Sequence, residues 1–410
     1  MVMKMNYGLR NPKTELLIHA DIIEQSALDQ INLIIEHPAI HGLVAIQADC
    51  HSGIGAVIGF TGKFRGAVIP NIVGYDIGCG VMAYPMLDED IMVLKSDFME
   101  FDNYVRKNIP LGFHSRNGND KFYHDIIPES ADDIIKFNKK IEEEFFDHYN
   151  VRTKSHPRNQ LGTLGGGNHF IEVAESDDGK GFLMVHSGSR NLGTKVASYF
   201  QDMAKSICKA MMVDIPRELE YLPMKYGGHE YMKWLHITQR YAKYNREIMM
   251  RLMLRYFGRD FERENAIESV HNYISTRDNV IRKGAISAHK GERVIIPFNQ
   301  AEGSIIGVGR GVKSYLCSAP HGAGRVFGRK EMDRRLARGD VTMVQFEDSM
   351  KHVFSTSVKK RTIDESKFAY KPIEKVMKHI EETVEVQLRI KPIYNLKDDT
   401  KKRVYGKGKK

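Results

Sequence analysis

The chain has few cysteines and no long apolar run, and both shortages exclude classes of protein. Four cysteines occur in 410 residues, and no two of them have CxxC spacing. They fit neither a disulfide framework nor a zinc ribbon, so a reducing, cytoplasmic setting is the simplest interpretation. No apolar run approaches the ~20 residues of a membrane span, and residues 1–15 lack the apolar core of a signal peptide. We therefore expect no membrane association.

The basic excess is concentrated at the end of the sequence. The formal net charge is +9, and residues 397–410, with seven Lys/Arg and two Asp, contribute +5 of it. The remaining +4 is only mildly basic and gives modest support to nucleic-acid binding. Hydrophobic content of 42% and charged content of 28% are those of an ordinary globular protein, and the length allows one to three domains. Composition therefore leaves the function open.

Two glycine-rich turns that each carry a histidine form the most informative stretch. His169 follows GTLGGGN, and His186 precedes SGSRNLG. Between them, the unbroken apolar run Phe182–Val185 predicts a buried strand that ends at His186. Glycines let a backbone approach a phosphate or metal closely, but no Gly-Lys-Ser/Thr follows them, which excludes a P-loop. Two such turns, each with one histidine, are typical of one part of a binding site whose other residues lie elsewhere in the chain.

A carboxylate and a thiol lie three positions apart in GYDIGCGV. Asp76 and Cys79 can converge on one point, where the thiolate could bridge two borderline metal ions and the carboxylate could bind the harder one. The alternative is a buried cysteine beside a turn-forming aspartate. Asp49 and His51 in QADCH form a similar cluster, for which a simple turn is again the alternative.

Two further histidines lie in polar surroundings. We predict that His271 and Asn272 lie at the end of a helix. His271 could be a metal ligand with Asn272 as its polar neighbour, or the pair could be structural. His321 lies in SAPHGAGR, with Arg325 and Arg329 following it. The arginines could bind phosphate through forked contacts, and a neutral imidazole can attack phosphorus. A helix N-terminal turn with a chance histidine is the alternative.

Periodicity predicts both helices and strands. Helices are expected over Asp21–His37, Ala131–Tyr149, Lys195–Met212 and His236–Phe257, and strands over 42–46, 293–296 and 304–308. Neither an internal repeat nor a low-complexity linker divides the chain. If the polar clusters between Asp49 and Arg329 converge, most of the chain forms one domain around one cleft.

Together these clusters resemble the RtcB family of RNA-splicing ligases. Five blocks occur in the family's order: QADCHSGIGAVIG, GYDIGCGV, GTLGGGNHFIEV, HSGSRNLG and APHGAGRVFGR. HN at 271–272 and RKGAIS at 282–287 support them, and the resemblance covers essentially the whole chain. It implies an α+β fold, with one large domain over residues 1–397. Mixed sheets flanked by helices would surround a central dinuclear metal cleft, and residues 398–410 would form a basic tail.

The resemblance also implies an activity. Family members join an RNA 3′-phosphate or 2′,3′-cyclic phosphate end to a 5′-hydroxyl end, using GTP and Mn²⁺. The cyclic end would be opened, a histidine guanylylated, GMP passed to the RNA 3′-phosphate, and GMP released by the attacking 5′-hydroxyl. Such a protein would act on RNA in the cytoplasm as a monomer, in tRNA splicing or RNA repair, with an archease-like activator as a candidate partner.

The site residues follow from the same resemblance. His321 matches the guanylylated nucleophile. The metal ligands matched are Asp76, Cys79 and His169 for one ion and Cys79, His186 and His271 for the other. The guanylate-site positions matched are Asn168, Phe170, Glu172, Asn272, Pro297, Asn299, Gln300, Ser304, Gly322, Ala323, Gly324, Tyr370 and Lys397. The positions matched on the RNA path are Asp49, Arg190, Lys283, Arg325 and Arg329.

The chain departs from the family pattern in three places. Asn299 stands where many members have serine, and Gly78 replaces a common asparagine. The lysine matched by Lys397 commonly ends the chain, whereas here further residues follow it, and Lys401 and Lys407 compete for its role.

Two other functions fit part of the pattern. A dinuclear metal phosphoesterase would use the same cluster around Cys79 but would not need His321 in a guanylate pocket. A ligase-like protein without catalysis would only bind RNA ends and would not need a bridging thiolate.

Overall fold

The computed structural model describes residues 14–116 and 119–400. Its strands are β1 (Thr14–Ile18), β2 (Ile40–His51), β3 (Ile58–Phe64), β4 (Ala67–Val68), β5 (Gly80–Pro85), β6 (Phe170–Ser176), β7 (Gly181–Ser187), β8 (Leu222–Pro223), β9 (Ile267–Val270), β10 (Asn272–Ile274), β11 (Val280–Lys283), β12 (Ala285–Ser287), β13 (Arg293–Asn299), β14 (Gly303–Gly309), β15 (Ser318–Pro320) and β16 (Val384–Leu396).

Its α-helices are α1 (Gln25–Ile35), α2 (Pro70–Val73), α3 (Asp88–Ser96), α4 (Phe98–Asn108), α5 (Asp120–Ile126), α6 (Ala131–Ile141), α7 (Arg190–Ala210), α8 (His229–Tyr256), α9 (Arg329–Arg338), α10 (Met343–Ser349) and α11 (Ile373–Thr383). Short 3-10 or π turns are η1 (Pro128–Ser130), η2 (Glu142–Asp147), η3 (Pro157–Asn159), η4 (Met224–Gly228), η5 (Arg263–Asn265), η6 (Lys313–Tyr315), η7 (Lys360–Glu365) and η8 (Lys367–Ala369).

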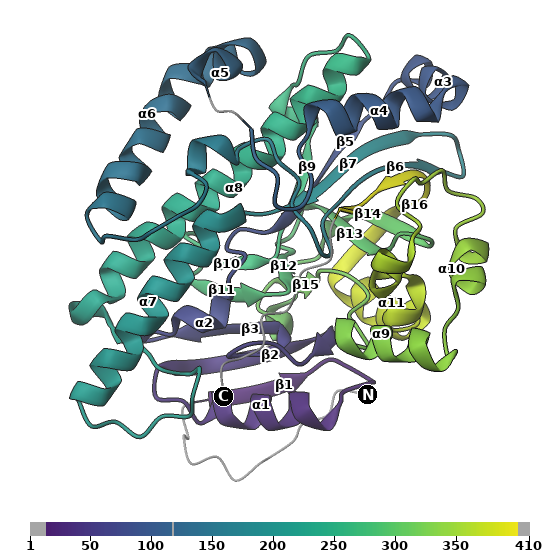
Figure 1. The fold of residues 1–410 in the computed structure, drawn as a ribbon. Coiled ribbons are helices and arrows are strands. Elements are labelled where there is room, and N and C mark those ends of the chain that lie inside the picture. The colour runs from purple at the N-terminus through teal and green to yellow at the C-terminus, as the bar shows by residue number, and fades with distance from the viewer. Residues whose placement is uncertain (1–13, 117–118, 401–410) are drawn as a thin grey trace.

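A seven-stranded sheet with the order β13-β14-β16-β6-β7-β5-β9 occupies the centre of the molecule (Figure 1). A five-stranded sheet, β1-β2-β3-β11-β10, lies below it in this view. Each neighbouring pair in the order β6-β7-β5-β9 is antiparallel, so β5 runs in the same direction as β6, and β9 in the same direction as β7. The starts of β5 and β6 and the ends of β7 and β9 therefore meet at the same edge of the sheet.

Strand β7 is buried on both of its faces. Phe182 and Met184 belong to one apolar cluster, and Leu183 and Val185 belong to another on the opposite face of the sheet. A strand covered on both faces has a continuous apolar run instead of an alternating one. The predicted strand at Phe182–Val185 is thereby confirmed.

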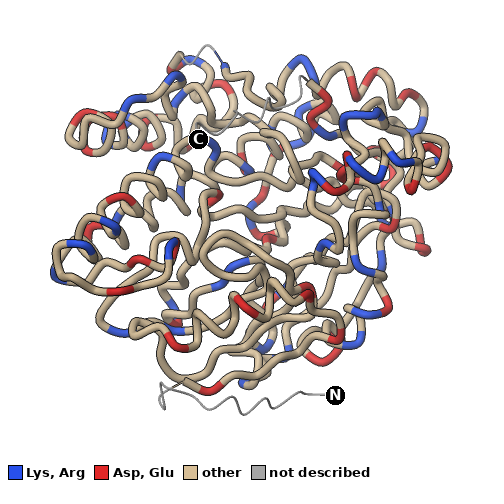
Figure 2. The backbone as a smooth tube through the Cα atoms, turned by 60° about the horizontal axis from the view of Figure 1, so that its bottom comes forward, with Lys and Arg blue, Asp and Glu red and all other residues tan. Residues whose placement is uncertain are grey.

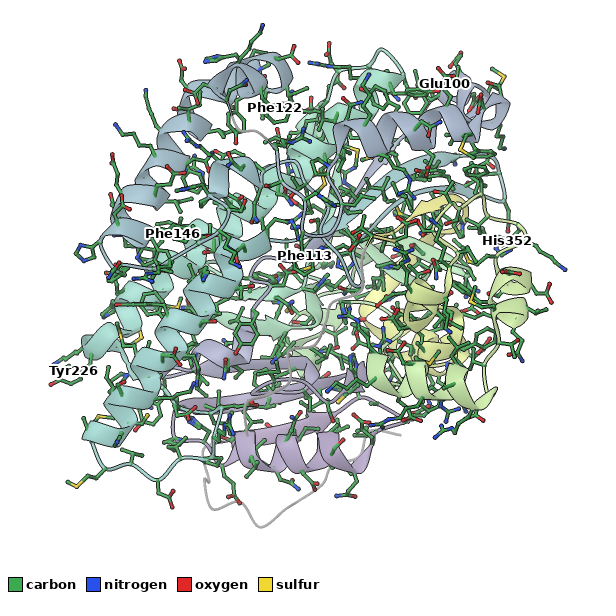
Figure 3. All side chains as sticks on the ribbon, viewed as in Figure 1. Glu100, Phe113, Phe122, Phe146, Tyr226 and His352 are labelled. Atoms are coloured by element: carbon green, nitrogen blue, oxygen red, sulfur yellow. The ribbon has the colours of Figure 1, made fainter. Side chains whose placement is uncertain are left out.

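Helices cover the sheets from two sides (Figure 1). Helices α5 to α8 gather on one side of the central strands, and α9 to α11 lie on the other. Side chains fill the space between these layers, and the exposed Tyr226 points away from the molecule at its edge (Figure 3). Basic and acidic residues are interspersed along the backbone (Figure 2). Among the helices of residues 14–116 and 119–400, none is both long and apolar enough to cross a membrane.

The predicted elements are confirmed except in two places. The helix expected over Ala131–Tyr149 ends as an α-helix at Ile141 and continues as a π-helical segment, η2. A π turn holds more residues than an α turn, so the 3.6-residue pattern does not reveal it. The placement of His271 and Asn272 at a helix end is wrong, because His271 lies between β9 and β10 and Asn272 is the first residue of β10. Val270, just before them, pairs with Gly80 at the start of β5.

The division of the chain after Lys397 stays a prediction. Asp399 lies beyond that point but is bound to the body by an ion pair with Arg106 (2.9 Å) and by another with Lys359. Residues 401–410, and with them Lys401 and Lys407, lie outside the described part of the chain.

Replacement of Leu183 by alanine tests the central position of β7. Leu183 is fully buried, so Leu183→Ala should lower the free energy of unfolding by about 2–5 kcal/mol. Urea denaturation followed by circular dichroism measures the change. The matched control is Met92→Ala on α3, where the side chain is 63% exposed and the change should stay within about 0.5 kcal/mol. Equal losses at the two positions would contradict this account of the core.

Candidate active site

Four metal-ligand candidates lie where the central strands meet at one edge. Cys79 directly precedes β5, and His169 directly precedes β6. His186 is the penultimate residue of β7, and His271 follows β9. All four side chains are buried. The sheet topology thus brings together residues that are up to 192 positions apart, as 271 − 79 shows.

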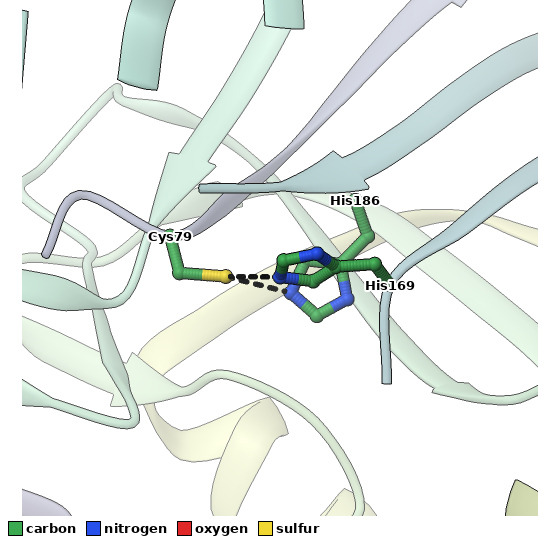
Figure 4. Close-up of side chains that lie close together, drawn as sticks. All are labelled: Cys79, His169 and His186. Carbon is green, nitrogen blue, oxygen red and sulfur yellow. Dashed lines mark hydrogen bonds between the residues drawn. The ribbon is translucent and has the colours of Figure 1, made fainter. Parts of the chain in front are cut away.

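The ligand atoms of Cys79, His169 and His186 converge at short distances (Figure 4), and His271 lies next to His186. Cys79 Sγ lies 3.5 Å from His169 Nε2 and 3.3 Å from His186 Nε2, and the Nε2 atoms of His186 and His271 are 3.3 Å apart. Nitrogen ligands about 2.1 Å from a tetrahedral ion would be roughly 3.4 Å from each other. Asp76 adds a carboxylate, whose Oδ2 lies 2.8 Å from His169 Nε2. This donor set fits a borderline divalent metal ion.

The charge states of the cluster favour binding of a cation. Burial, together with neighbouring histidines, lowers the pKa of His186 and His271 well below the usual value, so both imidazoles are neutral and keep a free lone pair. Burial and the adjacent Asp76 raise the pKa of the Cys79 thiol, and a bound cation would reverse this effect. Burial alone would raise the pKa of Asp76, but the contact with His169 brings it well below its ordinary value.

The ring of His169 is held by a backbone carbonyl. His169 Nδ1 lies 2.9 Å from Leu164 O, a distance at which the ring N–H donates to that carbonyl. With Nδ1 held in this way, Nε2 faces Cys79 and Asp76. A hydrogen bond of this kind fixes the tautomer of a metal-binding histidine.

His321 lies beside the cluster and is oriented by Asp49. The ring centroids of His271 and His321 are 4.7 Å apart. The fully buried Asp49 accepts hydrogen bonds from the backbone N–H of His321 (3.0 Å) and from its ring Nδ1 (2.5 Å). A carboxylate in this position holds the imidazole with Nε2 unprotonated, as a nucleophile requires. The sequence placed Asp49 on the RNA path and gave no signal for this contact, because strand β2 and His321 are far apart in the chain.

A cavity of about 290 Å³ opens next to His321. It brings together most of the predicted metal, guanylate and RNA positions. Those that line it are Asp76, Cys79, Asn168, Phe170, Glu172, His186, His271, Asn272, Pro297, Asn299, Gln300, His321, Gly322, Ala323, Gly324, Arg325, Arg329, Tyr370 and Lys397. His169 lies behind the lining, in contact with Asp76 and Cys79.

Glu365 is a pocket residue that the sequence analysis missed. Its carboxylate is buried and receives Arg325 (3.2 Å), Arg329 (3.3 Å) and the hydroxyl of Tyr370 (2.7 Å). Lys397 Nζ lies 3.6 Å from the same carboxylate. Burial opposes ionisation of Glu365, but the three cations hold its pKa well below the ordinary value. The residue lies at the end of a short 3-10 turn, η7, which has no recognisable pattern in the sequence.

Two polar groups near the pocket are suited to a polar ligand. The carboxylate of Glu172 is buried, and Asn395 Nδ2 donates to it at 2.7 Å. Burial raises the pKa of Glu172 to about 8. Ser304 pairs with Pro297 of the pocket wall, and its buried Oγ has no hydrogen-bond partner within the described residues. An unsatisfied buried hydroxyl is costly unless a ligand or water completes it.

The predicted RNA-path residues are not all on the surface. Arg325 and Arg329 line the cavity. Lys283 is 3% exposed, and its ammonium donates to the backbone carbonyls of Ile54 and Asn71. Arg190 donates to Thr163 Oγ1 and Gly112 O, next to the loop that carries His169. A role in RNA binding stays a prediction for each of these positions.

The chain is similar to known proteins over most of its length. The family model described as tRNA-splicing ligase RtcB matches residues 30–398. The RNA-splicing ligase RtcB of Escherichia coli strain K12 is 30% identical over 96% of this chain and 100% of its own length. The tRNA-splicing ligase RtcB of Thermococcus kodakarensis is 25% identical over 88% of each chain, and RNA-splicing ligase RtcB homolog 1 of Entamoeba histolytica is 25% identical over 72% of this chain and 68% of its own. The chain belongs to the RtcB family of tRNA-splicing ligases.

Proposed function

We propose that this chain joins RNA 3′-phosphate or 2′,3′-cyclic phosphate ends to 5′-hydroxyl ends through a guanylylated His321. Family membership makes the chain an RNA ligase. The observation that carries the mechanism is the Asp49–His321 pair beside the buried cluster. Asp49 holds the proton on Nδ1 and leaves Nε2 as the nucleophile. A phosphoesterase would not need this arrangement.

The proposed metal is Mn²⁺, with two ions in the cleft. Asp76, Cys79 and His169 would hold one ion, and Cys79, His186 and His271 the other. The support is the convergence of a thiol, neutral imidazoles and a carboxylate at one strand edge. When bound, the ions would stabilise charge on the phosphates and activate the water that opens a cyclic phosphate.

The proposed reaction has four steps, and each step forms one bond and breaks another. Water breaks the P–O2′ bond of a cyclic end and leaves a 3′-phosphate with a free 2′-hydroxyl. His321 Nε2 then attacks the α-phosphorus of GTP, and pyrophosphate leaves. A 3′-phosphate oxygen attacks the same phosphorus, frees His321 and forms an RNA-3′-pp-5′-G end. The 5′-hydroxyl finally attacks the RNA 3′-phosphorus, giving a phosphodiester and GMP.

The far end of the pocket would bind the guanine. The Glu172 carboxylate can accept hydrogen bonds from the N1–H and N2–H groups of guanine, and the orphaned Ser304 Oγ can bond to the nucleotide. Phe170 and Tyr370 offer aromatic faces, and Lys397 Nζ lies 5.5 Å from the ring centroid of Phe170. Of the three candidate lysines, Lys397 is therefore supported by its position in the pocket.

The RNA partner would approach over Arg325 and Arg329, which line the cavity next to His321. The basic segment after Lys397 would add attraction for phosphates. We place the protein in the cytoplasm as a monomer, acting in tRNA splicing or RNA repair, with an archease-like protein as a candidate activator. Four unpaired thiols support a reducing compartment.

Covalent labelling tests the nucleophile. Incubation with Mn²⁺ and GTP labelled at the α-phosphate should label the wild-type protein on a denaturing gel, and His321→Gln should remove the label. Asp49→Asn should slow labelling by about 10²-fold or more, because the imidazole loses its orienting carboxylate. The control is His352→Gln, whose ring bonds Ala301 O and does not line the pocket. Absence of label on folded wild type that hydrolyses cyclic phosphates would favour a phosphoesterase.

Metal titration tests the two-ion centre. Electron paramagnetic resonance of free Mn²⁺ should give two bound ions per wild-type chain, and Cys79→Ser should weaken binding at least about tenfold, because a thiolate shared by both ions is lost. Cys208→Ser is the matched control, since Cys208 is also buried but bonds only Tyr221 among the described residues. A stoichiometry of one ion would contradict the dinuclear assignment.

The pH dependence of guanosine binding tests Glu172. The carboxyl group must be ionised to accept hydrogen bonds from both N1–H and N2–H of guanine, and its pKa in the free protein is raised to about 8. Affinity should therefore rise roughly tenfold per pH unit as pH increases toward 8, and level off above it. Guanosine is the probe because it has no phosphate that titrates in this range, and isothermal calorimetry measures binding. Glu172→Gln should bind more weakly with no such slope, and a slope that persists in this variant would refute the assignment.

A further inference from the structure

We propose that Asn245 and Arg246, adjacent residues in helix α8, are positioning residues that hold the four ligand-bearing segments in register before metal binds. The inference rests on the proposed metal centre. Neither residue belongs to the ligand set or to the cavity next to His321. Both are nevertheless buried, at 0% and 1% exposure, directly behind the strand ends that carry the ligands.

The carboxamide of Asn245 connects two of the segments. Its Oδ1 accepts from the backbone N–H groups of Gly162 (2.8 Å) and Thr163 (3.1 Å). Its Nδ2 lies 3.1 Å from each of Thr163 O, Ser187 Oγ and Gly188 O. The oxygen faces two N–H donors, so the orientation of the amide is fixed by its partners. One side chain thus joins the loop before His169 to the end of β7.

A chain of hydrogen bonds continues from Asn245 to a ligand. Ser187 Oγ donates to Leu164 O at 2.7 Å. The same carbonyl accepts from His169 Nδ1 at 2.9 Å and thereby sets the tautomer of that ring. Asn245 holds Ser187, Ser187 holds the Leu164 carbonyl, and this carbonyl directs Nε2 of His169 toward the metal position.

The guanidinium of Arg246 connects the remaining segments. One of its terminal nitrogens donates to Gly78 O (2.6 Å), just before Cys79, and to Ser187 O (2.8 Å), just after His186. Its Nε donates to Glu268 of β9 at 2.9 Å. Burial opposes ionisation of Glu268, but Arg246 and Arg263 lower its pKa, so the carboxylate remains charged in its buried position.

A single helix therefore sets the relative positions of all four segments. Residues 245 and 246 project about 100° apart around α8, which lets one side chain reach the His169 loop and the other reach Cys79 and β9. Helix α8 contacts both β7 and β5. A buried charge pair adds little to stability compared with an apolar pair. The contacts of Arg246 with three ligand segments instead provide a rigid site in which the metal-ligand atoms already lie close together.

Binding of Co²⁺ tests the proposal without a measurement of ligase activity. Co²⁺ bound to the wild type should give a thiolate charge-transfer band and visible d–d bands, and chelator competition gives its affinity. Arg246→Lys keeps the charge but cannot make forked contacts, and Asn245→Asp keeps the shape but loses the Nδ2 donors. Each should weaken Co²⁺ binding by about 10–100-fold and shift the bands, because supporting groups tune metal affinity by this amount.

Arg251→Lys on the same helix is the matched control. Arg251 is also largely buried and pairs with Glu247 (3.1 Å) and with Glu129, and within the described part of the chain none of its hydrogen bonds reaches a ligand segment. This variant should keep the wild-type Co²⁺ affinity and spectrum even if its melting temperature falls. A purely structural role for Asn245 and Arg246 would instead make metal affinity follow melting temperature in all three variants.

The outcomes separate the inference from the metal assignment. Folded Asn245 and Arg246 variants with wild-type affinity and bands would overturn the positioning role and leave the metal centre intact. Wild type without a thiolate band would overturn the metal centre itself. If either variant fails to fold, Ser187→Ala removes only the hydroxyl between Asn245 and Leu164, and unchanged binding in this mildest variant would likewise overturn the proposal.

Discussion

The convergence of buried lone pairs at one edge of the central sheet is the constraint on which the site depends. The thiol of Cys79 and the imidazoles of His186 and His271 face one another. Burial disfavours the charged form of each of these groups. Such groups would turn apart if their backbones were free, because none fully satisfies the hydrogen bonding of another. The antiparallel order of β6, β7, β5 and β9 keeps the backbones together, and helix α8 closes them from behind. This arrangement is suited to binding a cation.

The pocket next to His321 also holds like groups close together, and here the groups are positively charged. Arg325, Arg329 and Lys397 are close enough to repel one another, and the buried carboxylate of Glu365 lies between them. The carboxylate keeps the cations in place when no anion is bound, and it leaves part of their charge available to phosphate. The candidate metal ligands and the cations of the pocket both lie next to His321, where the proposed phosphoryl transfer would take place.

Local patterns in the sequence predicted many of the residues that the structure brings together around His321, since most of the candidate metal ligands lie in short motifs of glycines and polar residues. The strand around Leu183 was predictable because burial on both faces leaves a continuous apolar run. Asn245 and Arg246 were not, because within an amphipathic helix they look like ordinary polar residues. Glu365 and the contact of Asp49 with His321 depend on long-range packing, which no local pattern encodes. The π turn after Ile141 was hidden because it departs from the helical period.

The position of strand β16 in the central sheet determines when this sheet can be completed during synthesis. The strand lies between β14 and β6, so within the described sheet it is the only strand that joins the β13–β14 pair to the four strands next to the candidate metal ligands. Its residues, Val384–Leu396, leave the ribosome after all the other strands. Until then the edges of β14 and β6 remain open, and Lys397 is absent from the pocket. The central sheet is therefore completed only late in synthesis, and a nascent chain cannot assemble the pocket next to His321 while it is still attached at an earlier residue.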